Sequence, residues 1–308
     1  MNIPIFPVII SIIQVFGMFG IGFMAKHLNY LDERDLNKWS TFIVDFLMPL
    51  LIFYSITTGF PNTNLKTLFL LPTIGFSIML FGALTGFFFI KGIKSTDKDV
   101  IKTFHYFCAI NNFGYLPIII IQNIFNESGL ALFFLFNLGS QLAYWTIGVG
   151  LLGQESFSNK FKNIFSSSLF ALFIAVFIAV LDLTKHIPQL FLNICKSGGN
   201  AAVPLILILI GASLHKVPIK KYLRDIAYLT LVRLILLPLM IIFVLKFLNL
   251  SREIYSISLI IALMPVSVSA AVTTRRFGGS PDFAAASALL NTLISIITIP
   301  IGLWMFGN

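Results

Sequence analysis

Ten stretches of the sequence are apolar and long enough to cross a lipid bilayer as helices. A membrane-spanning helix needs roughly 20 apolar residues, and only short connections separate these stretches. Hydrophobic residues make up 57% of the 308-residue chain and charged residues only 11%, so a soluble fold could not cover its apolar surface. The sequence therefore predicts an all-α, multi-pass membrane protein. Its predicted spans are residues 4–25, 39–58, 65–90, 99–124, 129–152, 161–181, 189–213, 221–246, 254–275 and 282–305.

The first five spans and the last five follow the same order along the chain. Adding 155 to the limits of spans one to five places each of them on one of spans six to ten. Pro49 falls on Pro204 under this shift. Because five is an odd number, the second unit must enter the membrane from the opposite side. We therefore expect two inverted five-helix repeats, residues 1–153 and residues 154–308.

Lysine and arginine are distributed unevenly between the two sides of the predicted membrane. The loops opposite the N-terminus hold 15 of them and the loops on the N-terminal side hold 4. Basic loops remain in the cytoplasm, so we expect a protein of the plasma or inner membrane with both termini outside. This topology also accounts for the net charge of +9 without a nucleic-acid partner.

Two of the predicted spans are interrupted by residues that form helices poorly. Span four contains 111-NNFGYLP-117, and span nine contains 262-ALMPVSVSAAV-272. A proline within a helix removes a backbone donor, and unwound backbone at membrane depth requires protein or a cavity around it. A simple kink is the alternative for a single proline. For this pair we expect helices four and nine to be broken and to cross.

A broken helix begins anew inside the membrane, and its N-terminus carries roughly half a positive charge. In inverted repeats, two such N-termini approach the midplane from opposite faces and together suit a carboxylate. The side chains beside them become the predicted binding site. These residues are Asn111, Asn112, Gly114, Pro117, Pro265, Ser267 and Ser269.

Other polar side chains within the spans extend this prediction. Asn137 and Gln141 lie four residues apart in span five and share one helix face, and Asn291 is the near-counterpart of Asn137 in span ten. These amides either line the cavity or form hydrogen bonds between helices. Asp45 and Arg233 are candidates for ion coupling or pairing, since charges inside a membrane are costly. Asp45 could instead extend to the interface, and Arg233 could pair with Asp45, a substrate carboxylate or another helix.

Several of these segments resemble the auxin efflux carrier family. The similarity lies in NNFGYLP followed by NLGSQLAYWTIGVGLLG, in GNAAVPLILILIGASL, in ALMPVSVSAAV and in FGGSPDFAAASALLNTLISIITIPI. It covers nearly the whole chain. The resemblance implies ten helices in two inverted repeats, with helices four and nine crossing at their breaks. Members of this family move organic anions, namely auxin in plants and malate or malonate in bacteria, and the wider superfamily includes the bile acid:sodium symporters.

The sequence departs from the plant members in two places. Plant carriers have a long cytoplasmic loop between spans five and six, where this chain has only GQESFSNKFK. They also place an asparagine at both breaks, whereas span nine here offers Ser267 and Ser269. These differences argue against auxin as the substrate and favour a bacterial malate or malonate permease-like member.

The predicted function is a secondary active carrier of a small mono- or dicarboxylate. One bundle, spans one, two, six and seven, would move against a core that holds the crossed helices. The alternatives are a sodium-coupled symporter of bile-acid-like or other organic anions, and a sensor or channel that does not transport. The sequence shows no nucleophile–base or metal-ligand spacing, so we expect neither an enzyme nor a metal site. We expect no cofactor apart from a coupling ion, H⁺ or Na⁺. The expected partners are the anion and the bilayer, and a homodimer stays open.

Overall fold

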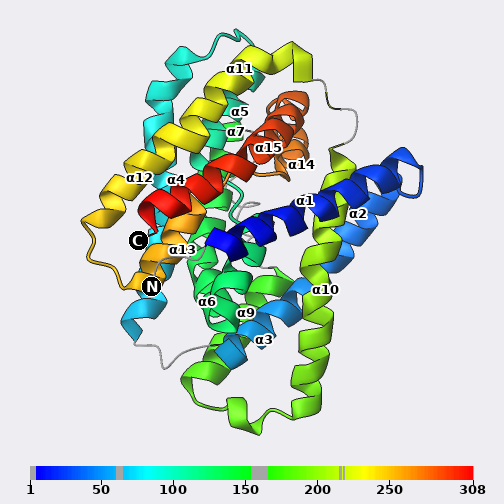
Figure 1. Cartoon of the computed structure of the whole chain (residues 1–308), viewed down its shortest axis with the longest axis vertical. Coiled ribbons are helices and arrows are strands. Elements are labelled where there is room, and N and C mark those ends of the chain that lie inside the picture. The colour runs from blue at the N-terminus through cyan, green and yellow to red at the C-terminus, as the bar shows by residue number, and fades with distance from the viewer. Residues whose placement is uncertain (1–4, 60–64, 154–165, 215–216, 218, 308) are drawn as a thin grey trace.

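The computed structural model describes residues 5–59, 65–153, 166–214, 217 and 219–307. Figure 1 shows that this part of the chain is a bundle of helices. The α-helices are α1 (Ile5–His27), α2 (Glu33–Phe42), α3 (Met48–Gly59), α4 (Leu65–Phe89), α5 (Lys98–Ala109), α6 (Tyr115–Ala143), α7 (Val149–Leu152), α9 (Ser167–Val180), α10 (Gln189–Ser213), α11 (Ile219–Leu231), α12 (Leu237–Lys246), α13 (Arg252–Ala262), α14 (Ala270–Phe277) and α15 (Pro281–Phe306). Short π-helical segments join α2 to α3 (Ile43–Leu47), α6 to α7 (Tyr144–Gly148) and α11 to α12 (Val232–Leu236).

The helices confirm a multi-pass membrane protein. In the described part of the chain, seven continuous helical stretches are long and apolar enough to cross a membrane. One of them, Tyr115–Leu152, contains the end of predicted span four and all of span five. The two spans are separated at Asn126, whose φ of 53° is not helical. The described residues of each predicted span are mostly helical, while the number of ten spans and the division into two repeats stay predictions.

The second predicted span begins earlier than its apolar run indicates. The polar stretch 33–38 is helical, because Asp32 caps α2 and forms a capping box with Asp35. The hydrogen bond from the backbone N–H of Asp35 lowers the pKa of the Asp32 carboxyl. Local polar chemistry thus starts a helix that hydrophobicity alone does not reveal.

Some sequence predictions concern residues outside the described part of the chain. They include Lys160, Lys162 and Lys216 among the basic loop residues. The predicted boundary between the repeats is also affected, because residue 153 is described and residue 154 is not. The predicted sixth span starts at residue 161, and its described helix, α9, begins at Ser167.

The helices pack in two groups. The first group consists of α1, α3, α9 and α10, where α1 packs on α10 and α3 lies between α9 and α10. The second group contains α4, α5 and α11 to α15. Helix α6 packs against α4 of the second group and also against α1 and α3 of the first. In Figure 1, α3, α9 and α10 lie toward the lower part of the view, and α5, α11 and α12 lie toward the upper left.

The outward faces of both groups are apolar. Large hydrophobic side chains stand exposed on α4, α9 and α12, including Phe69, Phe88, Phe170 and Phe243. A soluble monomer rarely exposes so continuous an apolar surface. Hydrocarbon is the medium that accommodates it.

Candidate functional site

Helices α5 and α6 are the two halves of one broken span. Helix α5 ends at Ala109, the chain continues in extended conformation from Ile110, and α6 begins at Tyr115. Pro117 lies in the first turn of α6, where a helix does not need the missing N–H. Pro117 is therefore part of the start of a new helix and not a kink within an old one. The predicted break of span four is confirmed.

Helices α13 and α14 are the two halves of the other broken span. Helix α13 ends at Ala262 and α14 begins at Ala270, so the unwound stretch contains Pro265 and Ser267. Adding 155 to 110–114, the first break, gives 265–269, which lies inside the second break. The shift that relates the spans in the sequence also relates these two interruptions.

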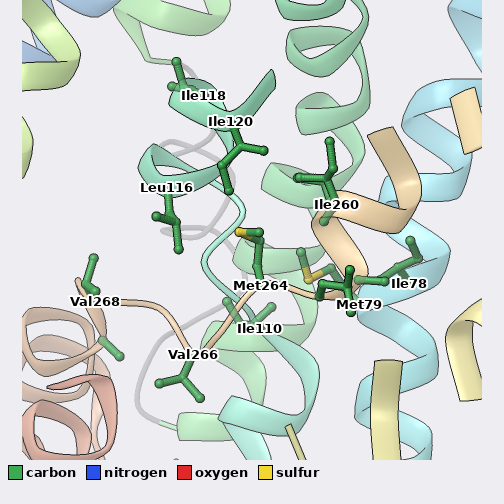
Figure 2. Close-up of a cluster of buried hydrophobic side chains, with 14 of the residues drawn as sticks. Ile78, Met79, Ile110, Leu116, Ile118, Ile120, Ile260, Met264, Val266 and Val268 are labelled. Carbon is green, nitrogen blue, oxygen red and sulfur yellow. The ribbon is translucent and has the colours of Figure 1, made fainter. Parts of the chain in front are cut away.

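The two unwound segments cross and are hydrogen bonded to each other. The backbone N–H of Asn112 donates to the carbonyl oxygen of Pro265 over 2.8 Å, and Asn111 and Val266 form an antiparallel bridge. Figure 2 shows the crossing, with Ile110 on one segment close to Met264 and Val266 on the other. Each segment thereby satisfies backbone groups of its neighbour, which is how irregular backbone is tolerated at membrane depth.

A cavity of about 680 Å³ lies beside this crossing. Its walls come from α3, α6 and α9, from Pro72 of α4, from the π-helical turns after α2 and α6, and from both unwound segments. The volume falls within the usual range of small-molecule sites. The cavity therefore separates the first group of helices from the crossover.

Six of the ten predicted binding residues line the cavity. They are Asn112, Gly114, Asn137, Gln141, Ser267 and Ser269. The cavity thus brings together residues from the two breaks, in spans four and nine, and the two amides of span five. The Ser267 and Ser269 hydroxyl oxygens are 3.0 Å apart, and the buried Asn137 Oδ1 has no partner among the described residues.

The other four predicted binding residues lie elsewhere. Asn111 is fully buried and its Nδ2 donates to the carbonyl oxygen of Ile261 over 2.6 Å. It therefore joins the first unwound segment to α13 and does not line the cavity. Pro117 and Pro265 are buried parts of the broken backbone. Asn291 Nδ2 donates to Thr230 Oγ1 over 3.3 Å, which joins α15 to α11 outside the cavity.

The two charged candidates, Asp45 and Arg233, do not form an ion pair with each other. The Asp45 side chain is exposed, and its closest polar partner is the Ser167 hydroxyl at 3.5 Å. Arg233 is 1% exposed and donates to the carbonyl oxygens of Met264 and Ala262 over 3.1 and 3.3 Å. Neither residue lines the cavity. The structure therefore does not contain the ion pair that the sequence left open.

The cavity contains polar residues that the sequence analysis missed. Tyr144, Trp145, Ser166 and Ser168 line it, and the Tyr144 hydroxyl lies 3.0 Å from Thr273 Oγ1. Tyr144 follows Gln141 by three residues, so helical periodicity would have placed both on one face. The two serines start α9, and no pattern in the sequence brings that helix next to the crossover.

The described lining of the cavity is uncharged. Asp, Glu, Lys, Arg and His are all absent from the described residues that line it. Helix α6 begins at its edge with Gly114 as N-cap, and no side chain caps this N-terminus. Phe113, Gly114 and Tyr115 all line the cavity, and none of their N–H groups donates to another described residue. The positive end of a helix dipole therefore lies at the edge of the cavity, and the donors there have no partner among the described residues.

Fold and site together define a class of protein: a multi-pass membrane protein whose central cavity is built at two broken, crossing helices. A family model described as "Membrane transport protein" matches residues 7–168 and 155–303 of the chain. The chain therefore belongs to this family, the auxin efflux carriers. The resemblance seen in the sequence motifs is confirmed.

Curated relatives match the chain over nearly its whole length. An uncharacterized transporter of Methanothermobacter thermautotrophicus is 25% identical over 299 residues, 94% of this chain and 96% of the relative. An uncharacterized transporter of Methanocaldococcus jannaschii is 21% identical over 99% of this chain and 100% of its own. A protein of Rhizobium meliloti, provisionally named a malonate transporter, is 21% identical over 94% and 92%. The chain is thus a membrane transporter and not an enzyme.

Proposed function

We propose that this transporter is a secondary carrier of a small organic anion, a mono- or dicarboxylate. The observation that carries the proposal is the uncapped N-terminus of α6, whose first residues line a cavity with no charged side chain among its described lining residues. An anion there would be held by backbone donors and by the neutral side chains of Asn112, Asn137 and Gln141. The name of the Rhizobium meliloti relative supports malonate as the first substrate to test.

Alternating access is supported by the uneven closure of the two ends of the cavity. Its lining includes Val44, Trp145 and Ser166, which lie at the span ends next to the basic loops. At the opposite end α6 is bonded to the first group: Glu127 Oε2 accepts from the Ser55 hydroxyl over 2.9 Å. Asn123 Nδ2 donates to Ser11 Oγ and Gln14 Oε1 over 2.9 and 3.0 Å. With basic loops in the cytoplasm, this conformation is inward-facing.

The test is counterflow of radiolabelled malonate in proteoliposomes with Asn112→Ala. Alanine keeps the backbone N–H that bonds Pro265, so the crossover survives while the cavity loses an amide. We expect at least about a tenfold loss of counterflow, the equivalent of about 1–3 kcal/mol for a polar contact made only by that group.

Asn193→Ala is the matched control, because Asn193 is exposed on α10 and its Oδ1 accepts only from Gln189. Its counterflow should equal that of the unmodified protein. Equal flux in both variants would contradict the assignment of the site. Conductance far above carrier rates, without counterflow, would indicate a channel instead.

A further inference from the structure

Arg233 is a charged group buried in the membrane interior without an acidic partner. It lies in the π-helical turn between α11 and α12 and is 1% exposed. Among the described residues, no carboxylate forms an ion pair with it. An arginine inside a membrane is expensive and therefore indicates a function.

The partners of Arg233 are carbonyl oxygens at the broken end of α13. Its Nη2 donates to Ala262 O, the last residue of α13, and its Nε donates to Met264 O in the unwound stretch. The C-terminal end of a helix carries about half a negative charge. The guanidinium thus neutralises this end and satisfies carbonyls that have lost their helical donors.

Carbonyls in this position are the usual ligands of a coupling cation in transporters with broken helices. In this chain four of the five carbonyls from Ile261 to Pro265 already accept from donors of other spans. Asn111 Nδ2 donates to Ile261 O and the Asn112 N–H to Pro265 O. Arg233 donates to two of the three carbonyls between them, those of Ala262 and Met264. A sodium ion would have to displace these donors.

We propose that Arg233 is the fixed cation of the crossover and stands where a coupling sodium ion would otherwise bind. It is a positioning residue: it holds the start of a segment whose continuation, Ser267 and Ser269, lines the cavity. Its role in anion binding rests on the proposed function. Binding of the anion by this protein then requires no sodium, which separates it from a sodium-coupled symporter.

The experiment compares the purified full chain with Arg233→Gln, Arg233→Lys and Lys196→Gln. Lys196→Gln removes the same charge from a span, but at an exposed position over the Tyr54 ring. Thermal stability is measured in sodium chloride and in choline chloride of equal ionic strength, first without substrate and then across a malonate titration.

We expect the unmodified protein and Lys196→Gln to show no stabilisation specific to sodium, and to bind malonate equally in both salts. Arg233→Lys should behave alike, since it retains the charge. Arg233→Gln should bind malonate about tenfold more weakly and should gain a sodium-specific stabilisation, because the vacated carbonyls can then hold the ion.

Sodium-specific stabilisation of the unmodified protein would overturn the inference. This measurement needs no variant, so it decides the question even where none of the variants folds. Equal malonate binding by Arg233→Gln and Lys196→Gln would overturn it as well. If no carboxylate binds to the unmodified protein, the proposed function fails. The salt comparison without substrate still decides the role of Arg233: a gain in Arg233→Gln supports it, and the absence of a gain overturns it.

Discussion

Individual residues in this protein are distinguished by what their side chains face. Asn137 and Asn291 are both amides within predicted spans, and the shift that relates the two halves nearly superposes them. Asn137 lines the cavity and has an unpartnered Oδ1. Asn291 does not line the cavity, and its Nδ2 donates to Thr230 on a neighbouring helix, although its Oδ1 likewise has no partner among the described residues. Similar sequence positions therefore serve different purposes.

At this scale we predict that Asn137→Ala raises the KM for malonate by about tenfold, since a neutral hydrogen bond contributes about 1 kcal/mol and an unpaired partner more. Asn291→Ala should leave KM unchanged and lower the thermal stability slightly, because interhelical bonds in membranes average about 0.6 kcal/mol. Counterflow at several malonate concentrations measures both. A raised KM in Asn291→Ala alone would reverse the assignment of the two amides.

Among the elements, α1 and α10 pack closely against each other. The sequence GMFGIG carries three glycines, but only one of them faces α10: a Cβ on Gly22 would collide with the carbonyl oxygen of Ile208. A Cβ on Gly17 or Gly20 would meet nothing within 4 Å. Small residues at a helix contact let backbones pack in a membrane.

The matched pair of glycines on α1 supplies the prediction at the element scale. Gly22→Ala should destabilise the protein by about 1–3 kcal/mol, the usual cost of overpacking. Gly20→Ala should be neutral or slightly stabilising, because alanine favours the helix. Thermal denaturation in detergent compares the two. Equal stabilities would show that α1 and α10 do not pack as described.

At the scale of the whole molecule, two groups of helices enclose a cavity that is closed at one end by polar contacts. Ser55 on α3 and Glu127 at the turn within α6 form one contact between the first group and α6. Next to it, a Cβ on Gly59 would collide with the carbonyl oxygen of Glu127, so the backbones are tightly apposed. In alternating access this end must open for the outward-facing state.

We predict that Ser55→Ala shifts the equilibrium toward the outward-facing state by about tenfold, because a hydrogen bond to a charged group contributes about 1.5–3 kcal/mol. Ser128→Ala is the control, since its hydroxyl bonds only the carbonyl of Phe125 on its own helix. A cysteine at Ser168, labelled by an impermeant thiol reagent from either side, reports the state.

Labelling at position 168 from the cytoplasmic side should fall in Ser55→Ala and stay unchanged in Ser128→Ala. Both native cysteines, Cys108 and Cys195, are buried, so the background should be low. Labelling of the parent protein from the outside alone would contradict the proposed orientation.

The sequence by itself determined the spans and the breaks. Helical hydrophobic stretches and helix-breaking residues such as Gly114, Pro117 and Pro265 act through local backbone chemistry, which depends on neighbours along the chain. For the same reason the polar residues beside the breaks could be predicted from the sequence, and six of the ten predicted residues line the cavity. It failed at α2, where a capping box extends the helix, because hydrophobicity does not register such a cap.

Only the tertiary structure decided which polar groups meet. The partners of Arg233 are carbonyls of another span, and backbone carbonyls have no signature in a sequence. Asp45 forms no ion pair with Arg233. Ser166 and Ser168 reach the cavity because α9 packs on α3. Contacts between spans depend on how helices are arranged around one another, and in a membrane small differences in packing set that arrangement.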